Sequence, residues 1–128
     1  MWVWIIDIVI LLAIVAWYLY PRWRLRRVAK VLDNQAFNQK ISENGQLIDV
    51  REPGEYRKKH IMGARNLPYT QIDQSLSALT KSKAVLLYEN GRPSNSTKVA
   101  GKLKKSGFTD VYILREGLSK WGGKVKES

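Results

Sequence analysis

The chain opens with an apolar stretch in which Asp7 is the only charged residue before residue 21. Residues 2–20 are otherwise apolar on every side of a helix, which at about 1.5 Å per residue would be roughly 28 Å long, close to the ~30 Å bilayer core. The pattern predicts an uncleaved transmembrane anchor over residues 1–20. The alternatives are a signal peptide, which lacks a basic start and an Ala-x-Ala site here, and a buried helix.

Basic residues follow this stretch at once, and the positive-inside rule places them in the cytoplasm. They are Arg22, Arg24, Arg26, Arg27 and Lys30. The sequence therefore predicts a single-pass protein of the cell membrane with its N-terminus outside and a cytoplasmic C-terminal domain. Its expected first partner is the lipid bilayer, through residues 2–20 and the basic flank. Residues 21–32 have apolar positions at helical spacing and are predicted to form a juxtamembrane helix or linker; the alternative is a plain basic flank.

Residues 33–128 alternate short apolar runs with segments of helical spacing. Leu47–Arg51, Val85–Leu87 and Val111–Leu114 are typical of buried strands, and Thr70–Leu79 has the spacing of a weak helix. Strands that alternate with short helices favour a central parallel sheet covered on both faces. The prediction is one α/β domain over residues 33–128.

Composition narrows the chemistry. The chain has no cysteine and a single histidine, His60, so disulfides, thiolate sites and zinc clusters are excluded, and we expect neither metal nor cofactor. The net charge of +11 leaves an electrostatic membrane or nucleic-acid binder as a hypothesis. The lysines at positions 98–105 lack the interleaved aromatic residues of single-strand binders, so nucleic acid is not the expected partner.

The strongest functional signal is the loop that follows the run Val85–Leu87. It contains Tyr88, Glu89, Asn90, Gly91, Arg92, Pro93 and Ser94, and a lysine-rich helical segment comes next. At the carboxyl end of a buried parallel strand, the N–H groups of such a loop and the positive end of the helix dipole favour an anion. The same arrangement lowers the pKa of a nucleophilic cysteine in enzymes that act on sulfane sulfur or phosphate esters.

Three further motifs accompany this loop in order along the chain. They are Asp49-Val50-Arg51-Glu52 with Glu55-Tyr56, His60-Ile61-x-Gly63-Ala64-x-Asn66-x-Pro68, and Glu116-Gly117-x-x-x-Trp121. Between about Asn34 and Trp121 the chain thus resembles a single-domain rhodanese. The resemblance implies a three-layer α/β fold with a central parallel sheet of about five strands, here preceded by one N-terminal transmembrane helix. It also implies a pocket with Asp49 and Arg51 on its rim, and sulfur transfer through a cysteine persulfide.

The loop departs from the family's usual Cys-x-x-Gly-x-Arg-Ser at two positions. Tyr88 occupies the position of the nucleophile, and Pro93 that of the arginine, with Arg92 displaced by one. A phenol with a pKa near 10 cannot replace a thiolate, so persulfide relay through this loop is excluded. Pro93 also removes one of the N–H donors that would bind an anion, and Glu89 brings negative charge to the edge of that anion site. We expect no catalytic residue here.

Two interpretations of the altered loop remain. Tyr88 and Arg92 have the composition of recognition residues, which predicts a protein-contact surface. The alternative is an unused loop in which Tyr88 fills the former pocket and turns its hydroxyl to solvent. His60 is interpreted as structural and not catalytic, and Asp49 as an acceptor of backbone N–H groups. Glu55 is expected to pair with a cation, although Asp49 and Glu55 are the residue types of an acid–base pair.

The leading functional hypothesis is a membrane-tethered, catalytically inactive rhodanese-like domain. It would serve as a cytoplasmic binding or regulatory module for an unknown cytoplasmic protein partner. The alternatives are a thiosulfate sulfurtransferase, which family membership alone would suggest, and the electrostatic membrane or nucleic-acid binder.

Overall fold

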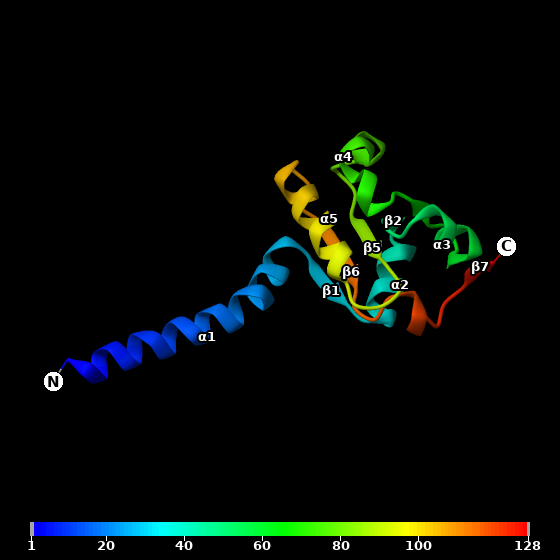
Figure 1. Cartoon of the computed structure of the whole chain (residues 1–128). Helices are drawn as coiled ribbons and strands as arrows, with labels where there is room; N and C mark the ends of the chain where they lie inside the picture. Colours follow the sequence, from blue (N-terminus) through cyan, green and yellow to red (C-terminus); the bar gives the residue numbers. More distant parts are fainter. Residues whose placement is uncertain (1, 128) are drawn as a thin grey trace.

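The computed structural model describes residues 2–127, with the backbone alone for residues 20–28. Helix α1 spans Val3–Val28 and extends away from the rest of the chain (Figure 1). Its large apolar side chains are exposed, including Trp4, Leu11 and Trp17. The basic residues predicted to flank an anchor lie outside the described side chains; they are Arg22, Arg24, Arg26 and Arg27.

The predicted membrane topology is contradicted. Crossing a bilayer needs about 20 consecutive, predominantly apolar residues in one helix. In the part of the chain that the structure describes, no helix combines the required length and hydropathy. The prediction of a single-pass membrane protein with an external N-terminus and a cytoplasmic domain is therefore wrong.

The helix expected through Leu32 ends earlier. After Val28 the chain becomes extended, and Lys30–Leu32 form strand β1, which pairs in parallel with strand β6 (Val111–Leu114). Pairing at the sheet edge explains the change, because the carbonyl of Leu32 accepts the N–H of Arg115 at 2.8 Å. Val31 and Leu32 pack against opposite apolar clusters, as alternate residues of a strand do.

The central sheet contains five parallel strands in the order β1-β6-β5-β2-β4, which confirms the predicted sheet. Strand β2 spans Gln46–Asp49, β4 Arg65–Asn66 and β5 Val85–Tyr88. A separate antiparallel pair joins β3 (Lys59–Ile61) to β7 (Val125–Glu127).

Helices cover both faces of this sheet and give the three-layer architecture (Figure 1). Alternate residues of β5 face opposite sides of the sheet. Val85 and Leu87 belong to the apolar cluster that contains Val99 of α5 (Ser94–Lys105). Leu86 and Tyr88 belong to the one that contains Phe37 of α2 (Asn34–Ser42). The helical elements are α2 (Asn34–Ser42), α3 (Pro53–Lys58), η1 (Tyr69–Gln71), α4 (Ile72–Ser75), η2 (Leu76–Ala78), α5 (Ser94–Lys105) and η3 (Leu118–Lys120). The weak helix expected over Thr70–Leu79 is thus three short helical turns, which bury Ile72.

Strands β2 and β5 end level with each other, because Asp49 is the register partner of Tyr88. The chain that follows β2 leads into α3, and the chain that follows β5 leads into α5. Since the carboxyl ends of parallel strands lie at one edge of a sheet, both connections meet there. This edge carries the candidate site.

Candidate functional site

Tyr88 is the last residue of β5 and is completely buried. Its hydroxyl oxygen accepts the backbone N–H of Ile61 at 3.0 Å. On the other side of β3, the N–H of Met62 donates to the carbonyl of Lys124, next to β7. Because successive N–H groups of a strand point in opposite directions, that of Ile61 faces away from β7 and toward Tyr88. Tyr88 therefore links the central sheet to the β3–β7 pair.

This placement corrects the prediction that Tyr88 is an exposed recognition residue. The side chain fills the core volume, as the alternative interpretation held, but its hydroxyl points into the protein and not to solvent. Burial, and then the negative charge of Asp49, raise the pKa of Tyr88 well above that of a free phenol. The phenol therefore stays protonated at neutral pH and cannot act as an anionic nucleophile.

Asp49 and Arg51 form a buried ion pair beside Tyr88. Arg51 Nη2 lies 2.7 Å from Asp49 Oδ2, Arg51 Nε lies 3.0 Å from Oδ1, and the backbone N–H of Arg51 also donates to Oδ1 at 2.9 Å. Asp49 thus accepts a backbone N–H, as predicted. Arg51 Nη1 donates to Asn90 Oδ1 at 2.8 Å, and Nη2 also donates to the carbonyl of Lys59. These bonds hold the guanidinium of Arg51 within the protein.

Glu89, the first residue after β5, directs its carboxylate toward the start of α5, where the loop would bind an anion. Its Oε1 accepts the backbone N–H of Ser96, in the first turn of α5, at 2.9 Å. Glu89 as a whole is only 9% exposed. A carboxylate at this position satisfies a free helix N–H and interacts favourably with the helix dipole. The expected anion site at the start of α5 is therefore occupied by a carboxylate of the chain itself.

Gly117 allows the loop to approach the following segment closely. The carbonyls of Glu89 and Asn90 accept the N–H groups of Leu118 and Ser119 at 2.8 and 2.9 Å. Gly117 has a φ of 71°, and a Cβ at this position would lie 2.5 Å from the Glu89 carbonyl oxygen. Both features require glycine, which gives the Glu116-Gly117 motif a structural role.

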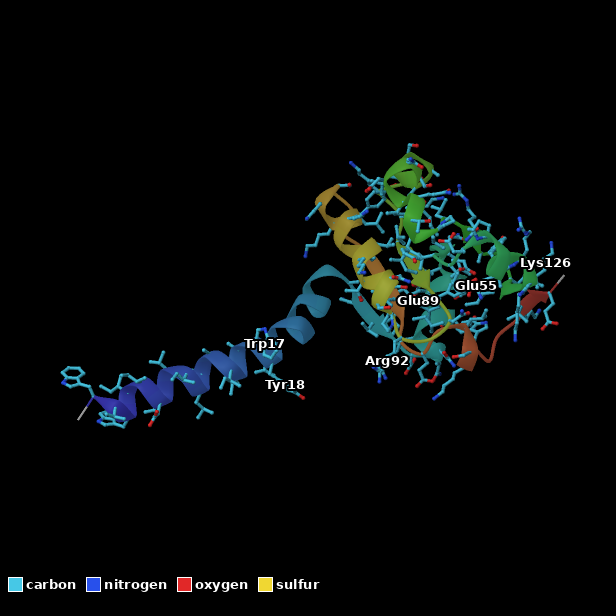
Figure 2. All side chains as sticks on the ribbon, in the orientation of Figure 1. Trp17, Tyr18, Glu55, Glu89, Arg92 and Lys126 are labelled. Carbon is cyan, nitrogen blue, oxygen red and sulfur yellow. The ribbon has the colours of Figure 1, made fainter. Side chains whose placement is uncertain are left out.

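The far side of the loop is exposed. Arg92 and Ser94 are exposed, and the Arg92 guanidinium makes no hydrogen bond or ion pair with any residue of 2–127 whose side chain is described. Figure 2 shows Arg92 at the outer edge of the domain. Pro93 has no N–H, but its carbonyl accepts the N–H of Thr97 and so begins the ladder of α5. Of the two predicted recognition residues, only Arg92 is accessible.

A pocket of about 570 Å³ lies between α3, η1 and the loop after β5. Its lining includes Arg51, which was predicted on the rim; Asp49, also predicted there, is fully buried and does not line the pocket. The lining residues are Arg51, Glu52, Gly54, Glu55, Lys58, Tyr69, Glu89, Asn90, Gly91 and Asn95.

His60 and Asn66 support the site from outside the pocket. His60 stacks on Tyr56 with 3.8 Å between ring centroids, and its Nδ1 lies 2.8 Å from the Tyr56 carbonyl oxygen. Asn66 Nδ2 donates to the carbonyls of Asp49 and Arg51. The packing role expected for His60 agrees with these contacts. The role of Asn66 was missed, although its motif signalled a structural position.

The sequence matches the family model described as "Rhodanese-like domain" over residues 33–124. This chain belongs to the rhodanese-like family. It is 38% identical over 122 residues to the protein YqhL of Bacillus subtilis, covering 95% of this chain and 92% of YqhL. It is 32% identical over 83 residues to the thiosulfate sulfurtransferase GlpE of Pseudomonas paraeruginosa, covering 63% of this chain and 74% of GlpE.

Solved structures agree with this assignment. The BH2092 protein of Bacillus halodurans superposes with a TM-score of 0.69 at 26% identity, covering 84% of each chain. The rhodanese-like domain of the Anabaena protein Alr3790 gives a TM-score of 0.67 at 27% identity, covering 76% of this chain and 78% of that domain. The rhodanese-like fold predicted from the motifs is confirmed.

Proposed function

We propose that this chain is a catalytically inactive rhodanese-like domain that acts as a binding module. The observation that carries the proposal is that Tyr88, which the motif resemblance aligns with the family's nucleophile, is buried and accepts the Ile61 N–H through its hydroxyl. The 128 residues contain no cysteine that could take its place.

Sulfur transfer needs a thiolate that attacks a sulfane sulfur and carries it as a persulfide. A protonated, buried phenol performs neither step. Glu89 adds a second obstacle, because its carboxylate already accepts the Ser96 N–H that an anionic sulfur donor would need. A donor such as thiosulfate would have to displace a tethered carboxylate and approach its negative charge.

The name of one relative, thiosulfate sulfurtransferase, describes an activity that this loop is not built to support. The site still contains a pocket that could hold a ligand. The pocket of about 570 Å³ is within the ~300–1,000 Å³ range of ligand sites, and it rests on rigid strand ends. Such a pocket suits recognition without chemistry.

The direct test is a thiosulfate:cyanide sulfurtransferase assay on the purified full chain. We expect thiocyanate formation equal to that of a no-protein control, with a cysteine-containing rhodanese as the positive control. The matched variant Tyr88→Phe should give the same background. Turnover above the control by the native chain, abolished by Tyr88→Phe, would disprove the proposal.

A further inference from the structure

Charge is distributed unevenly along the chain, and one long segment has no exposed carboxylate. Residues 74–109 contain seven lysines and arginines and a single acidic residue, Glu89. Glu89 is buried and bonded to the Ser96 N–H, so it does not offset the positive charge of the surface. The exposed cations of this segment are Lys81, Lys83, Arg92, Lys98, Lys102, Lys104 and Lys105.

Three of these lysines form one stripe along α5, which we call the basic stripe. Lys98, Lys102 and Lys105 are four and three residues apart, so they share one face of the helix. The opposite face packs into the core through Val99 and Leu103. Because α5 covers one face of the sheet, the basic stripe faces outward (Figure 1). At about 1.5 Å per residue it is roughly 10 Å long.

The stability of α5 explains only part of the basic stripe. The helix dipole favours cations in the last turn, which accounts for Lys102 and Lys105. Lys98 lies outside the last turn, and four residues before Lys102 it adds repulsion between like charges. No acidic residue within Ser94–Lys105 offsets this repulsion. The position of Lys98 therefore favours a role in binding over one in the fold.

The ion pair that the basic stripe makes within the chain shows which group it accepts. Lys102 Nζ lies 3.1 Å from Oδ2 of Asp73, which belongs to α4. The two side chains are 45% and 72% exposed, so the pair contributes little to stability and separates easily. Lys98 and Lys105 make no ion pair with a side chain that the structure describes. The basic stripe thus presents cations that are available to carboxylates from outside.

We propose that the basic stripe binds an acidic segment of a partner protein, through ion pairs between its lysines and glutamate or aspartate side chains. An extended peptide rises about 3.3 Å per residue, so about four residues span the stripe. The inference rests on the proposed binding function and names the surface and the chemistry of the partner.

An acidic peptide suits this surface better than a nucleic acid or a lipid bilayer. Single-stranded nucleic acids bind where aromatic side chains stack on their bases, and α5 contains no aromatic residue. A helix that binds a bilayer surface inserts an apolar face, whereas the apolar face of α5 is already buried through Val99, Ala100 and Leu103. Ion pairs with carboxylates need neither feature.

The test titrates the full chain with a capped peptide of six glutamates at about 0.15 M ionic strength and follows the backbone amides of residues 94–105 by NMR. The matched peptide contains six glutamines. We expect saturable shifts with the glutamate peptide and at least tenfold weaker binding of the glutamine peptide. The double variant Lys98→Gln/Lys105→Gln should weaken binding at least fivefold, and its helix should persist because glutamine and lysine have similar helix propensities.

The matched control is Lys124→Gln/Lys126→Gln, which removes the same charge from exposed residues at β7. It should change the affinity less than twofold. Equal loss in the two double variants would assign binding to the net charge of the chain and overturn the inference. Absent shifts, or tighter binding of a thymidine hexanucleotide or of phosphatidylserine vesicles, would also overturn it.

The sulfurtransferase assay on the same sample separates this inference from the proposed function. Turnover refutes the inactive module. A basic stripe that does not bind the glutamate peptide, in a chain without turnover, refutes only the recognition of acidic segments.

Discussion

Replacing Tyr88 with phenylalanine tests the structural role of this residue most directly. The change keeps the ring and removes only the hydroxyl that accepts the Ile61 N–H at 3.0 Å. Tyr88 and Ile61 are both buried, so water cannot replace the lost acceptor. Leaving a buried donor unsatisfied costs about 1–3 kcal/mol. With a loss of about 2 kcal/mol and a urea m-value of about 2 kcal/mol/M, the midpoint of unfolding should fall by about 1 M.

The measurement is equilibrium urea unfolding of the full chain, followed by circular dichroism, with Tyr69→Phe as the matched control. Tyr69 is half-buried, and its hydroxyl makes no hydrogen bond with any described residue, so this change should move the midpoint far less. If the two variants lose the same stability, the hydroxyl of Tyr88 does not join the sheet to β3, and our account of this position fails.

Three further outcomes are expected. Because burial raises the pKa of Tyr88, folding favours its neutral form. Above pH ~10 the free energy of unfolding of the native chain should therefore fall more steeply than that of Tyr88→Phe, by up to about 1.4 kcal/mol per pH unit. Parallel pH profiles of the two proteins would contradict this. Asp49→Asn should lower the free energy of unfolding, measured in urea, by about 3–5 kcal/mol, because it leaves Arg51 buried and unpaired. The control Lys102→Met breaks an exposed ion pair and should lower it by less than about 1 kcal/mol. Similar losses in the two variants would refute the assigned burial of the Asp49–Arg51 pair. Tyr88→Cys alone should show at most feeble thiocyanate formation. Adding Glu89→Ala should raise the rate, because it removes the carboxylate that accepts the Ser96 N–H. Equal rates would show that Glu89 does not block binding of the sulfur donor.

The sheet could be predicted because two of its central strands, β5 and β6, are short runs without a charged or amide residue. Strand β5 is buried at each of its four residues, and no polar position interrupts it. Strand β1 was missed for the opposite reason. Val28, Ala29 and Leu32 repeat at helical spacing, and only pairing with β6 makes Lys30–Leu32 extended.

The place of the loop at the end of a strand could be predicted from the sequence, but the direction of its side chains could not. The position of Tyr88 at a strand end followed from the motif. The inward direction of its hydroxyl depends on the Ile61 N–H, which comes from a separate pair of strands. The same loop packs its backbone closely against Gly117, and no local pattern around residue 89 encodes a contact so distant along the chain.

Tyr88 and Glu89 are best understood together, because each satisfies a backbone group at the site. A helix start that binds a substrate anion leaves N–H groups without a protein partner while the site is empty, and such groups cost stability when they are buried. Here Glu89 satisfies the N–H of Ser96, and Tyr88 satisfies that of Ile61. Glu89 thus stabilises the native state by closing the anion site at the start of α5, and Tyr88 does so by joining the central sheet to β3. Restoring sulfur chemistry would therefore require more than a thiol: it would also require reopening bonds that now contribute to the stability of the fold.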